Sequence, residues 1–369
     1  MIDCSRRESL LRSARVRAEL LAARSGRYLG RALVIGGAAF AVVWVLFWAP
    51  KTTYGPAVDD PIDFAKTFLD SMTLAGVLFV VASGFTLIFG LMRVVNMAHG
   101  SLYLLGGYIA YDVQQRLVHN ANPGFGLLSS QVAVWQWIVP AIAASACIAV
   151  VGIVMQQGFL RWNQGQDLRQ ALITIALSII IADQMLAHWP IQESVAWPGT
   201  IDRFVSIGSI DYSLARLLML AVAVAVGIAL WLWLNETRTG MTIRAGVDDR
   251  QMVSALGVNI QITFAIAFVV GAALAGFGGA MGGSQFNLAP GQDGQWLLNS
   301  LVVVIIGGMG SLGGAAVGAI LYGTVLTFSG VYLPTTGNDC CTEYSVVFTF
   351  ALLAIVLAFR PQGLFGRAA

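Results

Sequence analysis

The stretch LVVVIIGGMGSLGGAAVGAI, at Leu301–Ile320, decides between two very different folds. A run of β-branched residues leads into Gly308, Gly310 and Gly313, whose G-x-G-x-x-G spacing is typical of a dinucleotide-binding turn between a strand and a helix. Such a turn needs a soluble βαβ unit and an acidic residue about twenty positions later to hold the ribose. Residues 321–338 contain no Asp or Glu. We therefore interpret the stretch as a membrane segment in which small residues permit close helix contact or a local helix break.

The composition of the whole chain supports a membrane protein. Of its 369 residues, 57% are hydrophobic and only 11% are charged, and the mean hydropathy is +0.75. Soluble domains contain about 25% charged residues, so this chain has too few to cover a surface that faces water. Its net charge of +2 by itself implies nothing about acidic partners. The sequence therefore predicts an integral membrane protein, because long apolar runs are typical of membrane-spanning helices.

Ten apolar segments follow one another along the chain, and we predict ten passes, with eight to ten as the range. They are Leu33–Ala49, Leu74–Leu91, Ala98–Tyr111, Val134–Met155, Ala171–His188, Leu217–Leu234, Ile262–Met281, Leu297–Ile306, Leu312–Tyr332 and Ser345–Phe359. The segments Ala98–Tyr111 and Leu297–Ile306 are too short for an ordinary span, which indicates broken or tilted helices.

The distribution of Lys and Arg predicts the orientation. With the N-terminus inside and ten passes, most Lys and Arg residues of the loops lie on the inner side, as the positive-inside rule requires. Many of these are in the Arg-rich stretch before residue 32. We expect the apolar segment that follows it, Leu33–Ala49, to be an uncleaved first helix. We therefore expect both termini inside, and we treat residues 1–68 as an Arg-rich cytoplasmic N-terminus, an extra helix and an outer loop.

Three stretches carry polar or charged groups within this apolar chain. Asn96 and His99 share one helical face between a long apolar run and a short one, where a helix break would need polar partners. Two functions stay open for this pair: a polar lining for a substrate path, or a hydrogen-bond clasp between helices. Asp183 lies well inside an apolar segment, where a carboxylate is a candidate titratable site, although the rim of the membrane is the favoured position.

The third stretch is the loop Gly240–Gln261, for which we predict a short amphipathic helix. Asp248 is a suitable N-cap and Gly257 a suitable residue just beyond the C-terminal end. Between them, Met252, Val253 and Leu256 form one apolar face. That face would contact the membrane surface or a groove on a cytosolic protein, although composition alone favours an unpartnered surface helix.

No catalytic or metal-binding pattern is present. The histidines His99, His119 and His188 lie in different segments, and the four cysteines have no metal-ligand spacing. The sequence contains no H-E-x-x-H, G-x-S-x-G or P-loop motif. We therefore predict neither enzymatic activity nor a cofactor, and no ATP binding by this chain through a P-loop.

Five motifs in order resemble the permease subunits of branched-chain amino-acid ABC transporters, and in particular the permease of each pair with an N-x-A-H-G motif. They are Asn96–Gly100 followed by Tyr103–Tyr108; Thr174–Ile180; the loop from Arg244 to Val258; Gly307–Gly314; and Arg360–Gly366. The resemblance covers Leu69–Gly366, and it implies an all-helical polytopic bundle with short or broken helices near the translocation path.

The resemblance also implies roles for residues. Residues 235–261 would be the coupling loop that docks on the ATPase. Its candidate residues are Arg244, Asp248, Asp249, Arg250, Met252, Val253, Leu256 and Gly257. Candidates near the path or at helix breaks are Asn96, His99, Gly100, Gly307, Gly308, Gly310 and Gly313.

Members of this family work with a second, related permease, two cytosolic ATP-hydrolysing subunits and a periplasmic substrate-binding protein in the bacterial inner membrane. The implied activity is import of branched-chain or related amino acids by alternating access, with urea or short amides as the alternative cargo of close relatives. Asp183 departs from the uncharged polar residues expected there. It therefore keeps open a second hypothesis, a stand-alone proton-coupled carrier.

Overall fold

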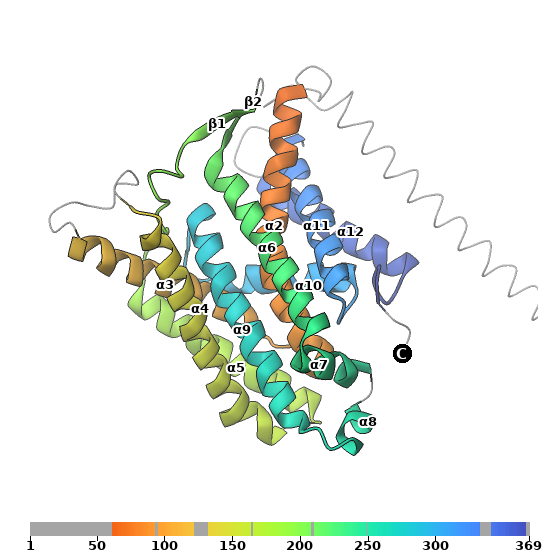
Figure 1. Ribbon diagram of the computed structural model, residues 1–369. Coiled ribbons are helices and arrows are strands. Elements are labelled where there is room, and N and C mark those ends of the chain that lie inside the picture. Colours follow the sequence, from red (N-terminus) through yellow and green to blue (C-terminus); the bar gives the residue numbers. More distant parts are fainter. Residues whose placement is uncertain are drawn as a thin grey trace, which may run out of the picture.

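The computed structural model describes residues 61–92, 95–121, 132–163, 165–207, 210–248, 250–332 and 341–366, and these form a bundle of helices (Figure 1). The helices are α2 (Pro61–Met92), α3 (His99–Ala121), α4 (Trp135–Met155), η3 (Gln156–Leu160), η4 (Arg161–Asn163), α5 (Asp167–His188), α6 (Leu214–Glu236), α7 (Arg238–Asp248), α8 (Arg250–Ala255), α9 (Ile260–Gln285), α10 (Asp293–Gly307), α11 (Leu312–Tyr332) and α12 (Cys341–Phe359). Within these residues, six helices are long and apolar enough to cross a membrane. The predicted all-α polytopic membrane protein is confirmed.

Each predicted apolar segment from Leu74 onward coincides with a helix. The segment Leu33–Ala49 lies outside the described residues, so the count of eight to ten passes stays a prediction. The two segments expected to be short differ from each other. α3 has 23 residues and continues well beyond its apolar part, whereas α10 has 15 residues. At 1.5 Å per residue α10 is about 22 Å long, less than the roughly 30 Å of a bilayer core.

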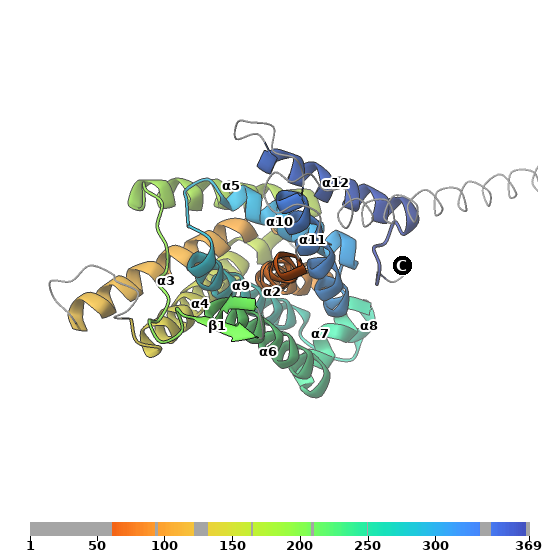
Figure 2. The same ribbon diagram turned by 90° about the horizontal axis from the view of Figure 1, so that it is seen from above.

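The helix α2 lies at the centre of the bundle, as the view from above shows (Figure 2). It packs against α6, α9, α10 and α11, and 83% of its most apolar window is buried. Two of its buried hydroxyl groups bond within the helix, since Ser71 Oγ donates to the Phe68 carbonyl and Ser83 Oγ to the Val80 carbonyl, each at 2.7 Å; the buried Thr86 Oγ1 has no hydrogen-bond partner among the described residues. Such back-bonding lets a polar side chain occupy an apolar helix.

Small residues bring α9 close to three neighbours. Gly271 faces Gly84 of α2, Gly276 faces Ile148 of α4, and Gly279 lies against the backbone of Tyr103 in α3. A β-carbon at any of these glycines would overlap its neighbour. Packing of small residues replaces the hydrophobic driving force that helices lack within lipid, so this glycine-rich helix connects the central α2 with α3 and α4.

The two ends of the bundle differ. At one end, β1 (Phe204–Ile207) and β2 (Ile210–Ser213) form an antiparallel hairpin with Phe204 opposite Ser213, which we call the hairpin end. The all-helical prediction did not include this hairpin. At the opposite end lie α7 and α8, which we call the α7–α8 end (Figure 1).

Candidate functional site

The segment before α3 is irregular, as the sequence predicted for a helix break. Asn96 accepts a hydrogen bond from the Ala98 backbone N–H at 3.2 Å through its own Oδ1, and its carbonyl accepts from the His99 N–H at 3.2 Å. His99 is fully buried. Its Nε2 lies 3.0 Å from the Val81 carbonyl, and its ring meets Phe85 edge-on. The Asn96–His99 pair therefore fixes the start of α3 against the middle of α2.

A second set of contacts connects the first turns of α3 and α10 with α5. Ser101 Oγ donates to Asp293 Oδ2 at 2.8 Å and lies 2.7 Å from Ser178 Oγ. The Met97 N–H donates to Thr174 Oγ1 at 3.2 Å. We call Asn96, His99, Ser101, Thr174, Ser178 and Asp293 the break cluster.

Gly100 makes the approach of α3 and α10 possible. A β-carbon at this position would overlap the Asp293 carbonyl oxygen and Leu297. The acidic side chain of Asp293 lies in the first turn of α10, where the partial positive charge of the helix N-terminus favours a carboxylate. The contact of His99 Nε2 with the Val81 carbonyl joins α3 to α2, as a clasp would, and the clasp function stays a prediction. The alternative function, a substrate path, stays a prediction.

The break cluster keeps some hydrogen-bonding capacity. Six buried side-chain atoms of the described residues have no hydrogen-bond partner, and two of them, Asn96 Nδ2 and His99 Nδ1, belong to this cluster. Most buried polar groups in proteins are paired, so two such atoms on residues three apart make this segment unusual. No group of three His, Cys, Asp or Glu side chains in the described part of the chain could hold a metal ion.

The glycine-rich stretch forms the turn between α10 and α11 at the α7–α8 end. Gly308 and Gly310 have φ values of +104° and +84°, which L side chains rarely adopt. Gly307 and Gly314 face each other so closely that a β-carbon on either would overlap the other's backbone. The stretch thus serves both predicted purposes, because it breaks the chain direction and lets two helices approach. Gly313 is exposed and a β-carbon there would meet nothing within 4 Å.

The chain's last described residues close over this turn. The backbone N–H groups of Leu364 and Phe365 donate to the carbonyls of Ile306 and Gly307, both at 2.9 Å. Gly308 lies against the backbone of Gly366. Two motifs that are far apart in sequence therefore form one structure.

The helix α7 connects this turn with the central helix. Its N-terminus is capped by Thr237, whose Oγ1 accepts from the Gly240 N–H at 3.1 Å, a contact that satisfies one free backbone donor. Val247 of α7 lies against both Gly90 of α2 and Gly310 of the turn. Arg244 donates to Asn235 Oδ1 at 2.5 Å, so it holds α7 against the end of α6.

The prediction for Asp248 as an N-cap is wrong. Asp248 is the last residue of α7, which was not predicted as a separate helix. The reason is tertiary, since Ile243 of α7 is buried in the bundle and keeps this stretch helical. Asp249 lies outside the described residues, and of Asp248 and Arg250 only the backbone is described.

The C-terminal end of α8 agrees with the sequence. Gly257 has φ +83°, its N–H donates to the Ser254 carbonyl at 3.0 Å, and the Val258 N–H donates to the Val253 carbonyl at 3.4 Å. This pair of bonds is the Schellman motif.

The predicted apolar face of α8 is divided between two environments. Met252 and Leu256 are 60% and 75% exposed, whereas Val253 is only 6% exposed. Val253 therefore packs against its own chain, and the large apolar side chains exposed here are Met252 and Leu256.

Asp183 lies on the exposed side of α5, five residues before its last residue, His188. At 1.5 Å per residue it is about 7–8 Å from the end of the helix. This position agrees with the rim of the membrane, and its role stays a prediction.

Two groups of residues were missed by sequence reasoning. Ser101, Ser178 and Asp293 are brought together from positions 77 and 192 residues apart. One signal was available, because Asp293 is the only charged residue between Gln251 and Asn338. The second group lies at the hairpin end, around Asp70 and Arg216.

Comparisons with known proteins agree with this architecture. The family described as "Branched-chain amino acid transport system / permease component" matches residues 67–357. The chain is 27% identical over 312 residues to the high-affinity branched-chain amino acid transport system permease protein BraD of Pseudomonas aeruginosa, which covers 82% of this chain and 96% of that one. It is also 27% identical to LivH of Escherichia coli over 319 residues, with the same coverage. The solved PsaBC structure of Streptococcus pneumoniae has 12% identity over 79% of this chain and 91% of that one, with a TM-score of 0.40, too low to place any element.

Proposed function

The chain belongs to the permease-component family of branched-chain amino acid transport systems, and from this premise we propose how it works. It is a multi-pass permease subunit of an ATP-binding-cassette importer for branched-chain amino acids. The match from within α2 to within α12 is the observation that carries this proposal. ATP hydrolysis falls to two separate cytosolic subunits. A second, related permease and a periplasmic substrate-binding protein complete the transporter.

The α8 surface would be the contact with the ATPase. Met252 and Leu256 form an exposed apolar tip, and a short amphipathic helix of this kind fits a groove on a partner. Movement of α8 would pass through the adjoining α7 to the bundle, since Val247 contacts both α2 and the α10–α11 turn. A displacement at the α7–α8 end can therefore change how α2 packs against α10 and α11.

The break cluster would lie beside the translocation path. Irregular backbone at membrane depth is tolerated where protein or a water-filled cavity surrounds it, and half-helix N-termini suit anionic groups of a substrate. The first turns of α3 and α10 meet at Gly100 and Asp293. Gln295, on the exposed side of α10, supports a covering by the second permease, because a side-chain amide facing lipid is costly.

The orientation follows from the charges. Arg238 and Arg244 lie on α7 and Arg360 follows α12, so the positive-inside rule assigns the α7–α8 end to the cytoplasm. The hairpin end then faces the periplasm, and both termini lie on the cytoplasmic side of the bacterial inner membrane. This assignment places α8 on the side where ATP is available.

The test is uptake of labelled leucine, glutamate and urea by the native host with and without this chain, in the presence and absence of ATP. We expect loss of leucine uptake in the deletion strain, restored by the intact chain and abolished by ATP depletion. Loss of urea uptake alone would keep the ABC architecture but replace the substrate. Uptake that survives ATP depletion and collapses with the proton gradient would refute the proposal in favour of a stand-alone carrier using Asp183.

A further inference from the structure

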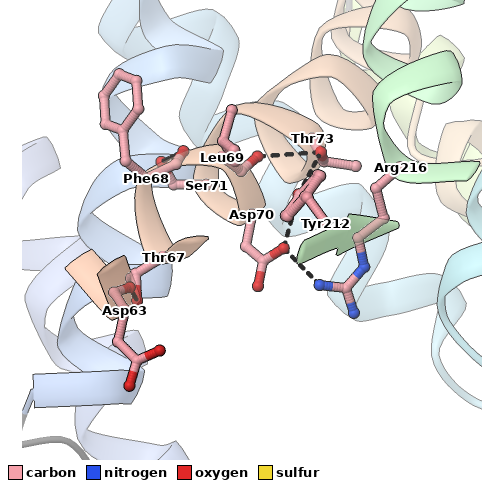
Figure 3. Close-up of polar contacts among 9 residues, drawn as sticks. All are labelled: Asp63, Thr67, Phe68, Leu69, Asp70, Ser71, Thr73, Tyr212 and Arg216. Carbon is pink, nitrogen blue, oxygen red and sulfur yellow. Dashed lines mark hydrogen bonds and ion pairs between the residues drawn. The ribbon is translucent and has the colours of Figure 1, made fainter. Parts of the chain in front are cut away.

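A buried-to-surface polar network ties four elements together at the hairpin end. Asp70 of α2 accepts through Oδ1 from the hydroxyl of Tyr212 in β2 at 2.8 Å, and through the same oxygen from Arg216 Nη1 of α6 (Figure 3). With its side-chain oxygen toward the guanidinium, Gln285 at the end of α9 accepts from Arg216 Nε at 2.9 Å and Nη2 at 3.2 Å. Three helices and the hairpin therefore hold one guanidinium and one carboxylate in fixed positions.

A further contact fixes the tyrosine that holds the carboxylate. Its hydroxyl oxygen lies 3.3 Å from Thr73 Oγ1, and Thr73 Oγ1 donates to the Leu69 carbonyl at 3.0 Å. Burial raises the pKa of Tyr212 to about 12, and the neighbouring Asp70 carboxylate contributes to the increase. Tyr212 therefore stays a hydrogen-bond donor to Asp70 at physiological pH.

This network forms one wall of an open cavity of about 450 Å³. The cavity is also lined by Lys66 of α2, by Asp202 and Asp211, and by the aromatic rings of Trp197 and Phe204. Its volume lies in the range of small-molecule sites, roughly 300–1,000 Å³.

The charged groups on the wall keep capacity for a ligand. The side chains of Asp70 and Arg216 are 36% and 37% exposed. Both contacts of Asp70 go to Oδ1, and its second oxygen points away from Tyr212 and Arg216 (Figure 3). The guanidinium has five N–H donors, and the contacts above use three. A cation and an anion that can each form further hydrogen bonds therefore lie side by side on the cavity wall.

The contribution of the Asp70–Arg216 pair to folding stability does not explain why so many neighbours orient it. Half-exposed ion pairs contribute about 0–1 kcal/mol, yet Tyr212, Thr73 and Gln285 all orient this one. Side chains locked by a surrounding shell are typical of binding sites.

The signs of the charges select the ligand. Two cations, Lys66 and Arg216, and three carboxylates, Asp70, Asp202 and Asp211, line the cavity. A simple anion would meet the carboxylates, and a simple cation would meet the guanidinium. A molecule with an ammonium and a carboxylate on one carbon satisfies both, because the guanidinium suits carboxylates and the carboxylates suit an ammonium.

We propose that this cavity is an outer receiving site that binds the zwitterionic head group of an α-amino acid, with Arg216 facing its carboxylate and Asp70 facing its ammonium. The aromatic wall of Trp197 and Phe204 then lies beside an apolar side chain. This inference rests on the proposed function, which brings a branched-chain amino acid to this side of the membrane.

The test measures protection of a cysteine placed in the cavity. Ser213 lines the cavity, so Ser213→Cys is introduced into the full-length chain after its four natural cysteines are replaced. Oriented vesicles are treated from outside with a membrane-impermeant thiol reagent, and the labelling rate is measured with leucine, isovalerate or isopentylamine. The last two each lack one charge of the head group. For a Kd of about 1 mM, leucine at about 10 mM would slow labelling roughly tenfold.

The variants Arg216→Gln and Asp70→Asn should each abolish the protection by leucine. Arg203→Gln is the matched control, because Arg203 is exposed in the same outer region and is absent from the cavity wall. Isovalerate and isopentylamine should protect in none of these chains.

Three results would overturn the site: no protection by leucine at that concentration, equal protection by all three compounds, or protection that survives in both variants. The site would also be overturned if the ligand-free substrate-binding protein, and not leucine, protected the cysteine from labelling. That result would mark the cavity as a docking surface for the binding protein. ATP-driven leucine uptake by the complete transporter is measured in parallel. Normal uptake without protection would reject this site and leave the proposed function intact, whereas absent uptake by the native chain would reject the function itself.

Discussion

The exposed tip of α8 gives the sharpest prediction. Leu256, in the turn that directly follows α8, is 75% exposed, whereas Val253 within α8 is 6% exposed. If the tip docks on the ATPase, truncation of Leu256 weakens the complex without weakening the fold. Truncation of Val253 does the reverse.

The expected magnitude follows from the area that remains to be buried. Full burial of a leucine side chain contributes about 1.5–3 kcal/mol. Because about three-quarters of Leu256 is exposed, Leu256→Ala should cost about 1–2 kcal/mol of binding free energy, or roughly 5–30-fold in Kd. Its effect on the free energy of unfolding should stay within about 0.5 kcal/mol, as for other exposed positions. For Val253→Ala we expect about 1–2 kcal/mol of destabilisation.

The assay is equilibrium binding of the purified ATPase subunit to the solubilised permease complex, together with thermal unfolding of the same samples. Ile191→Ala serves as the matched control. Ile191 is 64% exposed but follows α5 at the opposite end, where the ATPase cannot reach it. A polar replacement, Leu256→Asp, should abolish transport while the chain remains folded in the membrane.

The coupling role of α8 would be refuted if Leu256→Ala left the Kd unchanged. It would be refuted equally if Ile191→Ala weakened binding as much as Leu256→Ala does, or if the Leu256→Asp chain transported leucine at the normal rate.

Three further predictions concern the turn, the break cluster and the rim. Gly308→Ala should destabilise the solubilised chain by about 1–3 kcal/mol in thermal unfolding, because φ at this position is +104° and the new β-carbon would overlap Gly366. The control Gly313→Ala, where a β-carbon within α11 meets open space, should be neutral or stabilising. Equal losses of stability in the two variants would contradict backbone strain at Gly308. Asp293→Ala removes the carboxylate that accepts from Ser101 and should lower the free energy of unfolding by about 1–3 kcal/mol. Asp293→Asn keeps an oxygen that can accept this hydrogen bond, so it should lower the free energy of unfolding by less. Identical decreases for the two variants would show that this hydrogen bond is unimportant. Asp183→Asn should leave leucine uptake unchanged at every pH at which the native chain is measured, since Asp183 is exposed near the end of α5. If leucine uptake depended on a proton gradient and the variant lost that dependence, the hypothesis of a stand-alone carrier would be revived.

Much of the fold could be predicted because long apolar runs have few alternatives. The segments from Leu74 onward became helices, and Gly257 ends α8 as its position suggested. The break at Asn96–Gly100 was predictable too, because polar residues interrupt an apolar run where only a cavity or other protein can satisfy them.

The rest depended on tertiary contacts that periodicity does not contain. The helix α7 has a modestly polar sequence, and burial of Ile243 stabilises it. Val253 was expected on the outer face with Leu256, but it is buried against its own chain.

The two missed polar groups illustrate the same limit. Asp70 and Arg216 are 146 residues apart and meet only because α2 and α6 pack side by side. A charge of each sign at the same end of two apolar segments was the available signal, yet it does not say which segments are neighbours.

The central claim is that ATP on a partner drives amino-acid movement through this bundle by way of α8. The most direct measurement is leucine uptake into proteoliposomes that hold the complete transporter, with ATP enclosed or omitted and with native or Leu256→Asp chain. We predict uptake only with ATP and the native chain. ATP-independent uptake, or equal ATP-driven uptake by the Leu256→Asp chain, would contradict the account.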